Sequence, residues 1–291
     1  MTAAPTGQVD RLTVGSPAAL SFTPRDAEGL ELTIAAPATV DVFDGAGAAI
    51  ITAQEATISE DGHALSVALA ASALPLLDTY RVEWTAQIGE DERTWETALE
   101  IAGGYLFTIA EFRAQRSEFG AYPAATIQNA RRLAEDRFEG EVGCAFVPRG
   151  QREVLRGDGR DTLILRRVAL RAVFSLSIGG ESMSPAAIDA LEDHEAGMLI
   201  RPSGVVWPAG APIVIHYAHG YDRPAADVTG AALTLAKEYA TPGDAIPARA
   251  VLQSTEYGSF RLSVAGRDGR TGIPDVDAVI DFYHRKLPAV G

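Results

Sequence analysis

The chain has 291 residues, of which 47% are hydrophobic and 22% are charged, and its formal net charge is −14. At roughly 150 residues per domain this length predicts about two folded units, and the composition excludes wholly disordered and collagen-like chains. The single cysteine, Cys144, excludes an intramolecular disulfide and a multi-cysteine zinc site. The first residues lack the features of a signal peptide and no apolar stretch is long enough to span a membrane, so we expect a soluble protein of a reducing compartment.

The charge is unevenly distributed along the chain. Residues 1–102 contain 16 acidic residues and 4 arginines, a net charge of −12, whereas the remainder has a net charge of −2. This asymmetry predicts a domain boundary near Gly103–Gly104. It also disfavours a protein that wraps a nucleic acid, because sequence-independent affinity for nucleic acids comes from cations that neutralise phosphates. We interpret the acidity itself as a contribution to solubility.

From Leu12 to Ala102 the dominant hydrophobic period is two, which is typical of strands with one buried face. Short alternating runs separated by turn residues predict an all-β, immunoglobulin-like sandwich without the usual disulfide. Trp84 and Trp95 are predicted core residues of this sandwich. The predicted strands are 19–22, 30–34, 39–43, 50–54, 64–69, 80–88 and 94–101.

After Gly104 the pattern becomes mixed. Thr108-Ile-Ala-Glu111 is a capping box, and an apolar stripe from Ile127 to Val142 predicts a helix packed on one face. Pro224 opens a second such stripe that includes Val228, Leu235 and Tyr239. Strands are predicted at 152–156, 161–166, 171–178, 197–201, 212–218 and 253–264, with a short helix at Ser184-Pro185. The second unit is therefore predicted to be α+β, with helices around a small antiparallel sheet.

The last segment contains a polar, glycine-rich stretch at 266–272 and then a short helix that begins at Ile273-Pro274. Its apolar face contains Val276, Val279, Ile280, Tyr283 and Leu287. A helix of about fourteen residues is marginal alone in water, so this face must pack on another surface. Two interpretations remain open, because the helix could fold back onto its own domain or be carried by a flexible arm to a partner. The predicted divisions are a sandwich at 1–103, an α+β domain at 104–265 and an arm at 266–291.

No motif identifies a catalytic centre, and we expect no metal and no cofactor. The sequence lacks a P-loop, a GxGxxG turn after a strand and a GxSxG elbow. His216 and His219 have an offset that directs strand side chains to opposite faces, which disfavours a shared metal. Cys144 has no neighbour that would favour a thiolate, so a buried thiol is expected. An enzyme would need a site assembled from scattered residues, such as His216 with Asp222 or Glu195.

Three segments, in this order along the chain, resemble one protein family. They are Val206-Trp207-Pro208-Ala209-Gly210, then His219-Gly220-Tyr221-Asp222-Arg223-Pro224 leading into an alanine-rich helix, and finally Ile246–Arg249 with Thr271–Val279. The family is that of the head-to-tail connectors (adaptors) of long-tailed double-stranded DNA phages, and the resemblance covers about residues 105–291. Minimal members of the family lack a sandwich such as that predicted for residues 1–103, so the role of this added module is not implied.

The resemblance implies a structural virion protein of the neck, assembled in the host cytoplasm, and not an enzyme. It implies a ring of about twelve copies beneath the portal protein, through which DNA passes without specific binding, and contact with a stopper or other tail-side neck protein. It also implies that the C-terminal arm docks on the portal or on a neighbouring subunit through Ile273, Pro274, Val276, Val279, Ile280 and Tyr283. Deleting residues 272–291 should then abolish attachment and leave both domains folded. The alternatives are another neck protein (a stopper or tail terminator) and a surface module that binds carbohydrate or protein.

Overall fold

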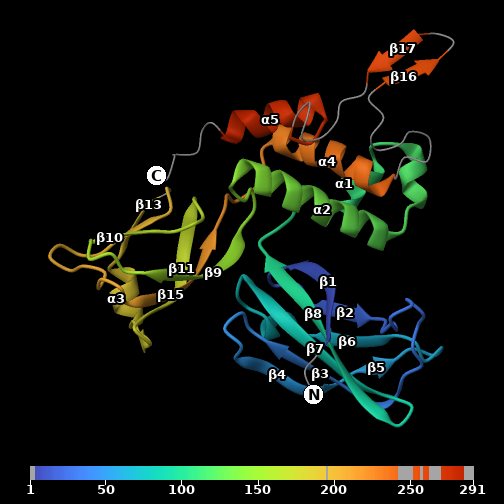
Figure 1. The fold of residues 1–291 in the computed structure, drawn as a ribbon, viewed down its shortest axis with the longest axis horizontal. Coiled ribbons are helices and arrows are strands. Elements are labelled where there is room, and N and C mark those ends of the chain that lie inside the picture. The colour runs from blue at the N-terminus through green and yellow to red at the C-terminus, as the bar shows by residue number, and fades with distance from the viewer. Residues whose placement is uncertain (1–3, 195, 242–251, 256–257, 262–269, 285–291) are drawn as a thin grey trace.

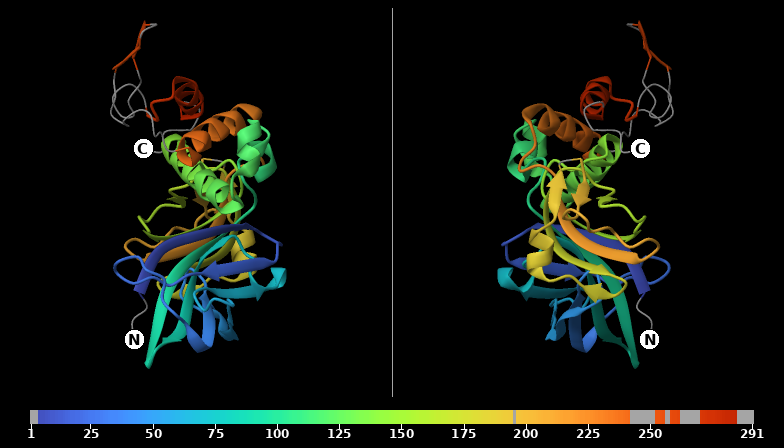
Figure 2. Two further views of the ribbon diagram at one scale, coloured as in Figure 1. Left: turned by 90° about the vertical axis from the view of Figure 1, so that its right-hand side faces the viewer. Right: turned by 90° about the vertical axis from the view of Figure 1, so that its left-hand side faces the viewer.

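The structure of the chain is a computed structural model that describes residues 4–194, 196–241, 252–255, 258–261 and 270–284. It is mostly β-sheet with a smaller number of helices (Figure 1). Most of the helices form a layer at one end of a β-sandwich, and a second group of sheets lies beside the sandwich (Figures 1 and 2). No described helix combines the length and the apolar character that crossing a membrane requires.

Residues 4–102 fold into two sheets that enclose one core. Apolar and polar side chains alternate along the central strands, so each sheet buries one face, as the period of two predicts. Phe22 of the smaller sheet stacks on Trp84 of the larger sheet with 5.8 Å between ring centroids, and Trp95 is also buried. The larger sheet has the order β1 (Ala4–Thr13), β8 (Asp91–Ala102), β7 (Asp78–Ile88), β3 (Ala35–Phe43) and β4 (Ala49–Glu55), and the smaller has β2 (Ala18–Phe22), β6 (Leu65–Leu69) and β5 (Thr57–Ile58).

Two features of the sandwich differ from the prediction. Strand β1 begins at Ala4 and pairs in parallel with β8, although the alternating pattern predicted strands only from Leu12 onward. The predicted strand at 30–34 is wrong, because this segment contains only an isolated bridge from Glu31 to Arg25. The Asp26 carboxylate accepts hydrogen bonds from the amides of Glu28 and Leu30, which holds the segment in a turn.

The helical layer is built on α2 (Ala124–Val142), which packs against α4 (Ala226–Ala240) and α5 (Pro274–His284). The capping box of Thr108 and Glu111 is present at the start of α1 (Ile109–Arg113), and α2 ends at Gly143 in the left-handed conformation. The predicted stripe of α2 is buried in full, and that of α4 is buried except for Tyr239, which is exposed. A 3₁₀ turn, η2 (Ser117–Ala121), connects α1 to α2.

The strands between residues 149 and 219 form the second group of sheets, which is antiparallel as predicted. Trp207 is buried between the two main sheets of this group, where it contributes to one core with Ile215 and Tyr217. One sheet has the order β12 (Glu181–Ser182), β11 (Leu170–Ile178), β15 (Pro212–His219) and β9 (Arg149–Arg156), and the other has β10 (Thr162–Ile164), β14 (Met198–Ile200) and β13 (Glu192–His194). Outside these sheets lie the short helix α3 (Pro185–Asp189), the 3₁₀ turn η1 (Ala71–Ala73) and a separate pair, β16 (Leu252–Thr255) with β17 (Gly258–Arg261).

Candidate functional site

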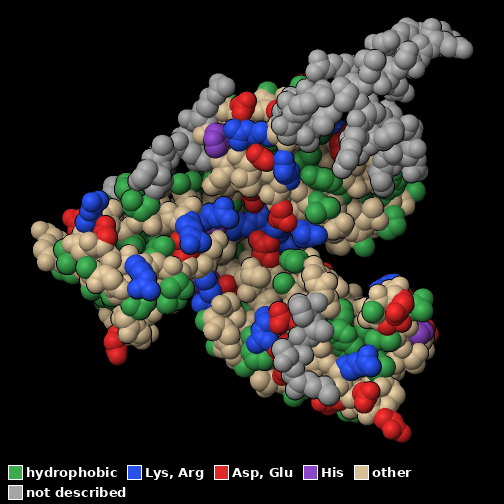
Figure 3. Space-filling model, in the orientation of Figure 1, with side chains coloured by type: hydrophobic (Ala, Val, Ile, Leu, Met, Phe, Trp, Pro, Cys, Tyr) green, Lys and Arg blue, Asp and Glu red, His purple; other side chains and the backbone are tan. Residues whose placement is uncertain are grey.

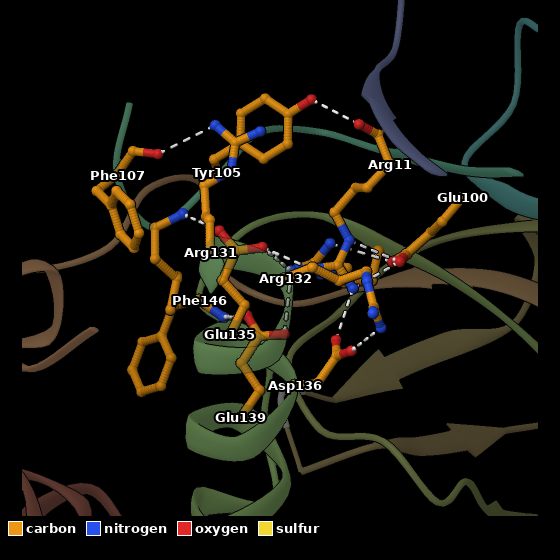
Figure 4. Close-up of polar contacts among 12 residues, drawn as sticks. Arg11, Glu100, Tyr105, Phe107, Arg131, Arg132, Glu135, Asp136, Glu139 and Phe146 are labelled. Atoms are coloured by element: carbon orange, nitrogen blue, oxygen red, sulfur yellow. Dashed lines mark hydrogen bonds and ion pairs between the residues drawn. The ribbon is translucent and has the colours of Figure 1, made fainter. Parts of the chain in front are cut away.

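The largest cluster of buried charge in the described structure joins the sandwich to the helical layer. Arg11 of β1 donates to Glu100 of β8 (2.7 Å from Nε) and to Glu135 (2.5 Å) and Asp136 (2.7 Å), both on α2. Arg149 of β9 contacts Glu100 (3.1 Å) and Glu135 (3.3 Å) from the opposite side. Figure 4 shows the contacts of Arg11 with Glu100, Glu135 and Asp136, and Figure 3 shows the band of mixed charge between the sandwich and the rest of the molecule. We call these residues, together with Glu139, the junction network.

The junction network is held in place by the main chain as well as by its own ion pairs. Glu135 is fully buried and its Oε1 accepts a hydrogen bond from the Leu106 amide at 2.7 Å. The Phe146 amide donates to Glu139, which also pairs with Arg149 at 3.2 Å. In both carboxylates the main chain holds Oε1, and the other oxygen, Oε2, faces a guanidinium, which is the arrangement that makes buried ion pairs tolerable.

Burial and mutual attraction act against each other on the pKa values of this network. Burial lowers the pKa of the Arg11 guanidinium, but the carboxylates of Glu100, Glu135 and Asp136 outweigh it, so the pKa is raised. The pKa of Glu139 is raised, because burial outweighs the attraction of Arg149. The pKa values of Arg11 and Arg149 are both raised, so both side chains stay charged, which is the condition for a fixed ionic connection between the sandwich and the helical layer.

A second polar connection lies where β9 meets the sandwich. Arg152 donates to Asp78 at 2.7 Å and to Asp44 at 3.1 Å, and the Nε2 atom of His216 lies 2.9 Å from the carbonyl oxygen of Leu77. Main chains approach closely at this point. A Cβ atom added to Gly150 would lie 2.0 Å from the Leu77 carbonyl oxygen, so only glycine fits there. The two connections fix the position of the sandwich on the rest of the chain.

A cleft of about 560 Å³ opens beside the junction network, between β1, β2 and the first half of α2. We call it the junction cleft. Arg131, only 6% exposed, contributes to its wall with its Cζ atom 3.3 Å from the Tyr105 ring centroid, and it donates to the Phe107 carbonyl oxygen. Polar side chains that line the cleft include Gln8, Asp10, Tyr105, Asn129, Arg131 and Arg132. The cleft is therefore suited to a polar or charged ligand.

A smaller cavity of about 350 Å³ adjoins the same network and contains His219 and Cys144. His219 is 4% exposed, and its Nδ1 atom has no hydrogen-bond partner among the described residues. Burial, with Arg167 and Arg149 nearby, lowers the pKa of His219 to about 3. Burial raises the pKa of Cys144 to about 12, so the sulfur is a thiol, as predicted from the sequence. Among the described residues, no three His, Cys, Asp or Glu side chains are placed to hold a metal ion.

Two of the residues considered for an assembled enzyme site, His216 and Asp222, have other partners. His216 is buried against Phe174, with ring centroids 4.8 Å apart, and against the Leu77 carbonyl. Asp222 pairs instead with Arg171 at 2.6 Å. Glu195, the other partner considered, lies outside the described residues.

The six residues predicted to dock on a partner lie on α5 or at its start, and the structure packs most of this face on the same chain. Val276 and Ile280 are buried in the helical core, and Ile273, Val279 and Tyr283 are partly buried against it. Pro274 is exposed. Of the two interpretations of this helix, the structure adopts the one in which it folds back onto its own domain. The outward face of the described part of α5 contains Ala278 and Phe282.

Sequence reasoning missed the junction network. Its ion pairs join residues up to 125 positions apart, so no local motif contains them. One signal was available on α2, where Arg131 and Glu135 follow Ile127 at intervals of four and therefore extend the buried stripe. Charged residues at such positions require partners from another element, which here are supplied by β1 and β9.

Comparison with solved structures gives a distant structural likeness. No protein-family model and no curated protein sequence matches the chain. Among solved structures, the titin Ig tandem domains A164-A165 are similar over 72% of this chain and 78% of the titin chain, with 12% sequence identity and a TM-score of 0.20. A likeness at this TM-score carries no argument about the fold or the activity of this chain.

Proposed function

We propose that the chain is a structural subunit of a phage neck, a head-to-tail adaptor that forms a ring beneath the portal and extends the channel for DNA. In this proposal residues 104–265 form the connector domain, with a ring of about twelve copies, and DNA passes without specific binding. The net charge of −14 agrees with this role, because a conduit for packaged DNA must not hold phosphates.

The observation that carries the proposal is the place of the three family-like segments in the fold. Trp207, in the first segment, is the buried anchor between the two main sheets of the second group. The segment from His219 to Pro224 carries the chain from the end of β15 to the start of α4. The segment that ends at Val279 starts α5 and places it on α2 and α4. The segment from His219 to Pro224 thus connects the sheets to the helices, and Ile246–Arg249 of the third segment lies outside the described residues.

The sandwich is proposed to be an added immunoglobulin-like module on the outside of the ring. Its attachment through buried ion pairs and close main-chain contacts supports a static role, because a sandwich held in this way has one orientation on each subunit. A ring of such subunits would present about twelve sandwiches in a regular array.

We propose that α5 docks on the portal through its exposed residues, whereas its buried residues stabilise the helical core. Val276 and Ile280 stabilise the helical core, so removing residues 272–291 would expose apolar surface and would not leave both domains intact. Attachment is better tested at the outward face, by changing Ala278 and Phe282 to glutamate. The buried residues then remain in place.

The decisive experiment mixes the purified chain with the portal protein of the same phage and records native mass spectra and electron micrographs. The expected result is a closed ring of identical subunits on one face of the portal. The Ala278→Glu/Phe282→Glu variant should remain folded by circular dichroism and bind the portal more weakly than the parent chain. Failure of the parent chain to bind the portal would refute the adaptor proposal. A stopper would differ because it would bind only after an adaptor ring was present.

A further inference from the structure

The junction cleft contains a cation that lacks an acidic partner. Arg131 forms no ion pair with any described residue. It donates to the Phe107 carbonyl oxygen, lies against the Tyr105 ring and is attracted by the Glu135 carboxylate without contacting it. Burial lowers the pKa of Arg131, which reports the cost of holding this charge away from water. An anion that entered the cleft would offset this cost.

The other charged side chains of the cleft do not supply that anion. Glu135 is already paired with Arg11 and Arg149. Asp10 accepts a hydrogen bond from Gln8, and its pKa is raised by burial. Arg132 contributes a second, partly exposed cation, which pairs with Asp136 at 3.5 Å, donates to Asn129 at 3.0 Å and attracts Asp10. The cleft therefore favours a carboxylate-rich ligand that reaches Arg131 past Arg132.

The chain carries such a ligand at the turn between β7 and β8. Glu90, Asp91 and Glu92 are consecutive, exposed, and form no ion pair with any described residue. The turn lies at the free end of the longest hairpin of the sandwich, away from the helical layer (Figure 1). At about 3.3 Å per residue, β8 separates Asp91 from Glu100 of the junction network by roughly 30 Å, so the turn cannot enter the cleft of its own chain.

We propose that the junction cleft of one copy binds the acidic β7–β8 turn, Glu90–Glu92, of the next copy. The turn and the cleft are different patches on the same subunit, so the contact is head-to-tail and can close a ring. The inference rests on the proposed ring and adds to it the side chains that connect neighbouring subunits. It also gives the acidic sandwich a role in assembly.

A charge exchange tests this contact. The turn variant Glu90→Lys/Asp91→Lys/Glu92→Lys and the cleft variant Arg132→Glu should each weaken self-association, measured by analytical ultracentrifugation, by about tenfold or more. A mixture of the two variants should recover association, because the lysines of one meet the glutamate of the other. The matched control Glu28→Lys/Glu55→Lys/Glu60→Lys makes the same charge change at exposed positions elsewhere on the sandwich and should associate like the parent chain.

The outcomes separate this inference from the proposed function. If the turn variant associates like the control, or if the mixture does not recover, the contact is refuted even when rings form on the portal. If the control is weakened as much as the turn variant, net charge is the cause and the contact is again refuted. If subunits associate through turn and cleft but do not bind the portal, the inference stands and the adaptor proposal fails.

Discussion

Replacing Glu135 by glutamine removes a fully buried carboxylate that Arg11 and Arg149 share. Glutamine has nearly the same shape and can still accept the hydrogen bond from the Leu106 amide. Both guanidiniums lose a charged partner, at 2.5 Å and 3.3 Å respectively. Breaking a buried ion pair by removing one partner costs about 3–5 kcal/mol. Because Glu100 still contacts both arginines, we expect the lower end, a loss of about 3 kcal/mol in the free energy of unfolding.

Urea titration followed by tryptophan fluorescence measures this loss. The matched control is Glu31→Gln, which removes a carboxylate from an exposed ion pair with Arg25 and should cost less than about 1 kcal/mol. The two variants change the same atoms and differ in burial. If Glu135→Gln loses no more stability than Glu31→Gln, the junction network does not hold the sandwich and the helical layer together, and the reasoning fails.

Three further predictions concern single side chains. Ile280→Ala should lower the free energy of unfolding by about 2–5 kcal/mol in the same titration, because Ile280 is buried. Phe282→Ala, at a 49% exposed position, should lower it by about 0.5 kcal/mol. Equal losses would show that α5 does not pack on its own chain. Because the pKa of His219 is lowered to about 3, the unfolded chain binds the proton first, so stability should hold above pH 6.5 and fall as the pH drops from about 6.5 toward 3. His219→Asn should reduce this fall by up to about 1.4 kcal/mol per pH unit in urea titrations at several pH values, and an unchanged slope would contradict the assignment. With its pKa raised to about 12, Cys144 should resist iodoacetamide at pH 8 until urea unfolds the chain, and equal labelling rates with and without urea would contradict its burial.

Much of the local structure could be predicted because its causes lie within a few residues. Patterns within a few residues account for three features. They are the capping box at Thr108, the buried stripe of α2 and the burial of Cys144. Strand β1 was missed because Pro5 and Gly7 interrupt its alternation, and its pairing with β8 shifts register at that point.

The candidate site could not be predicted because it depends on which faces meet. A stripe shows that one face of a helix is buried, but not what covers it, so α5 was equally compatible with its own domain and with a partner. The ion pairs of Arg11 likewise depend on β1, an edge strand that pairs in parallel with β8 and lies beside α2. Only the charged positions on the α2 stripe gave a local indication of the junction.

The glycine at the second connection has a mechanical consequence. Because a Cβ atom at Gly150 would overlap the Leu77 carbonyl oxygen, the sandwich rests on β9 through main-chain atoms as well as through side chains such as Arg152. A pull or twist applied to the sandwich would pass directly into β9 and from there into β15. The contact at Gly150 would therefore transmit force with little deformation, and Gly150→Ala would shift the whole sandwich relative to β9 instead of disturbing one loop.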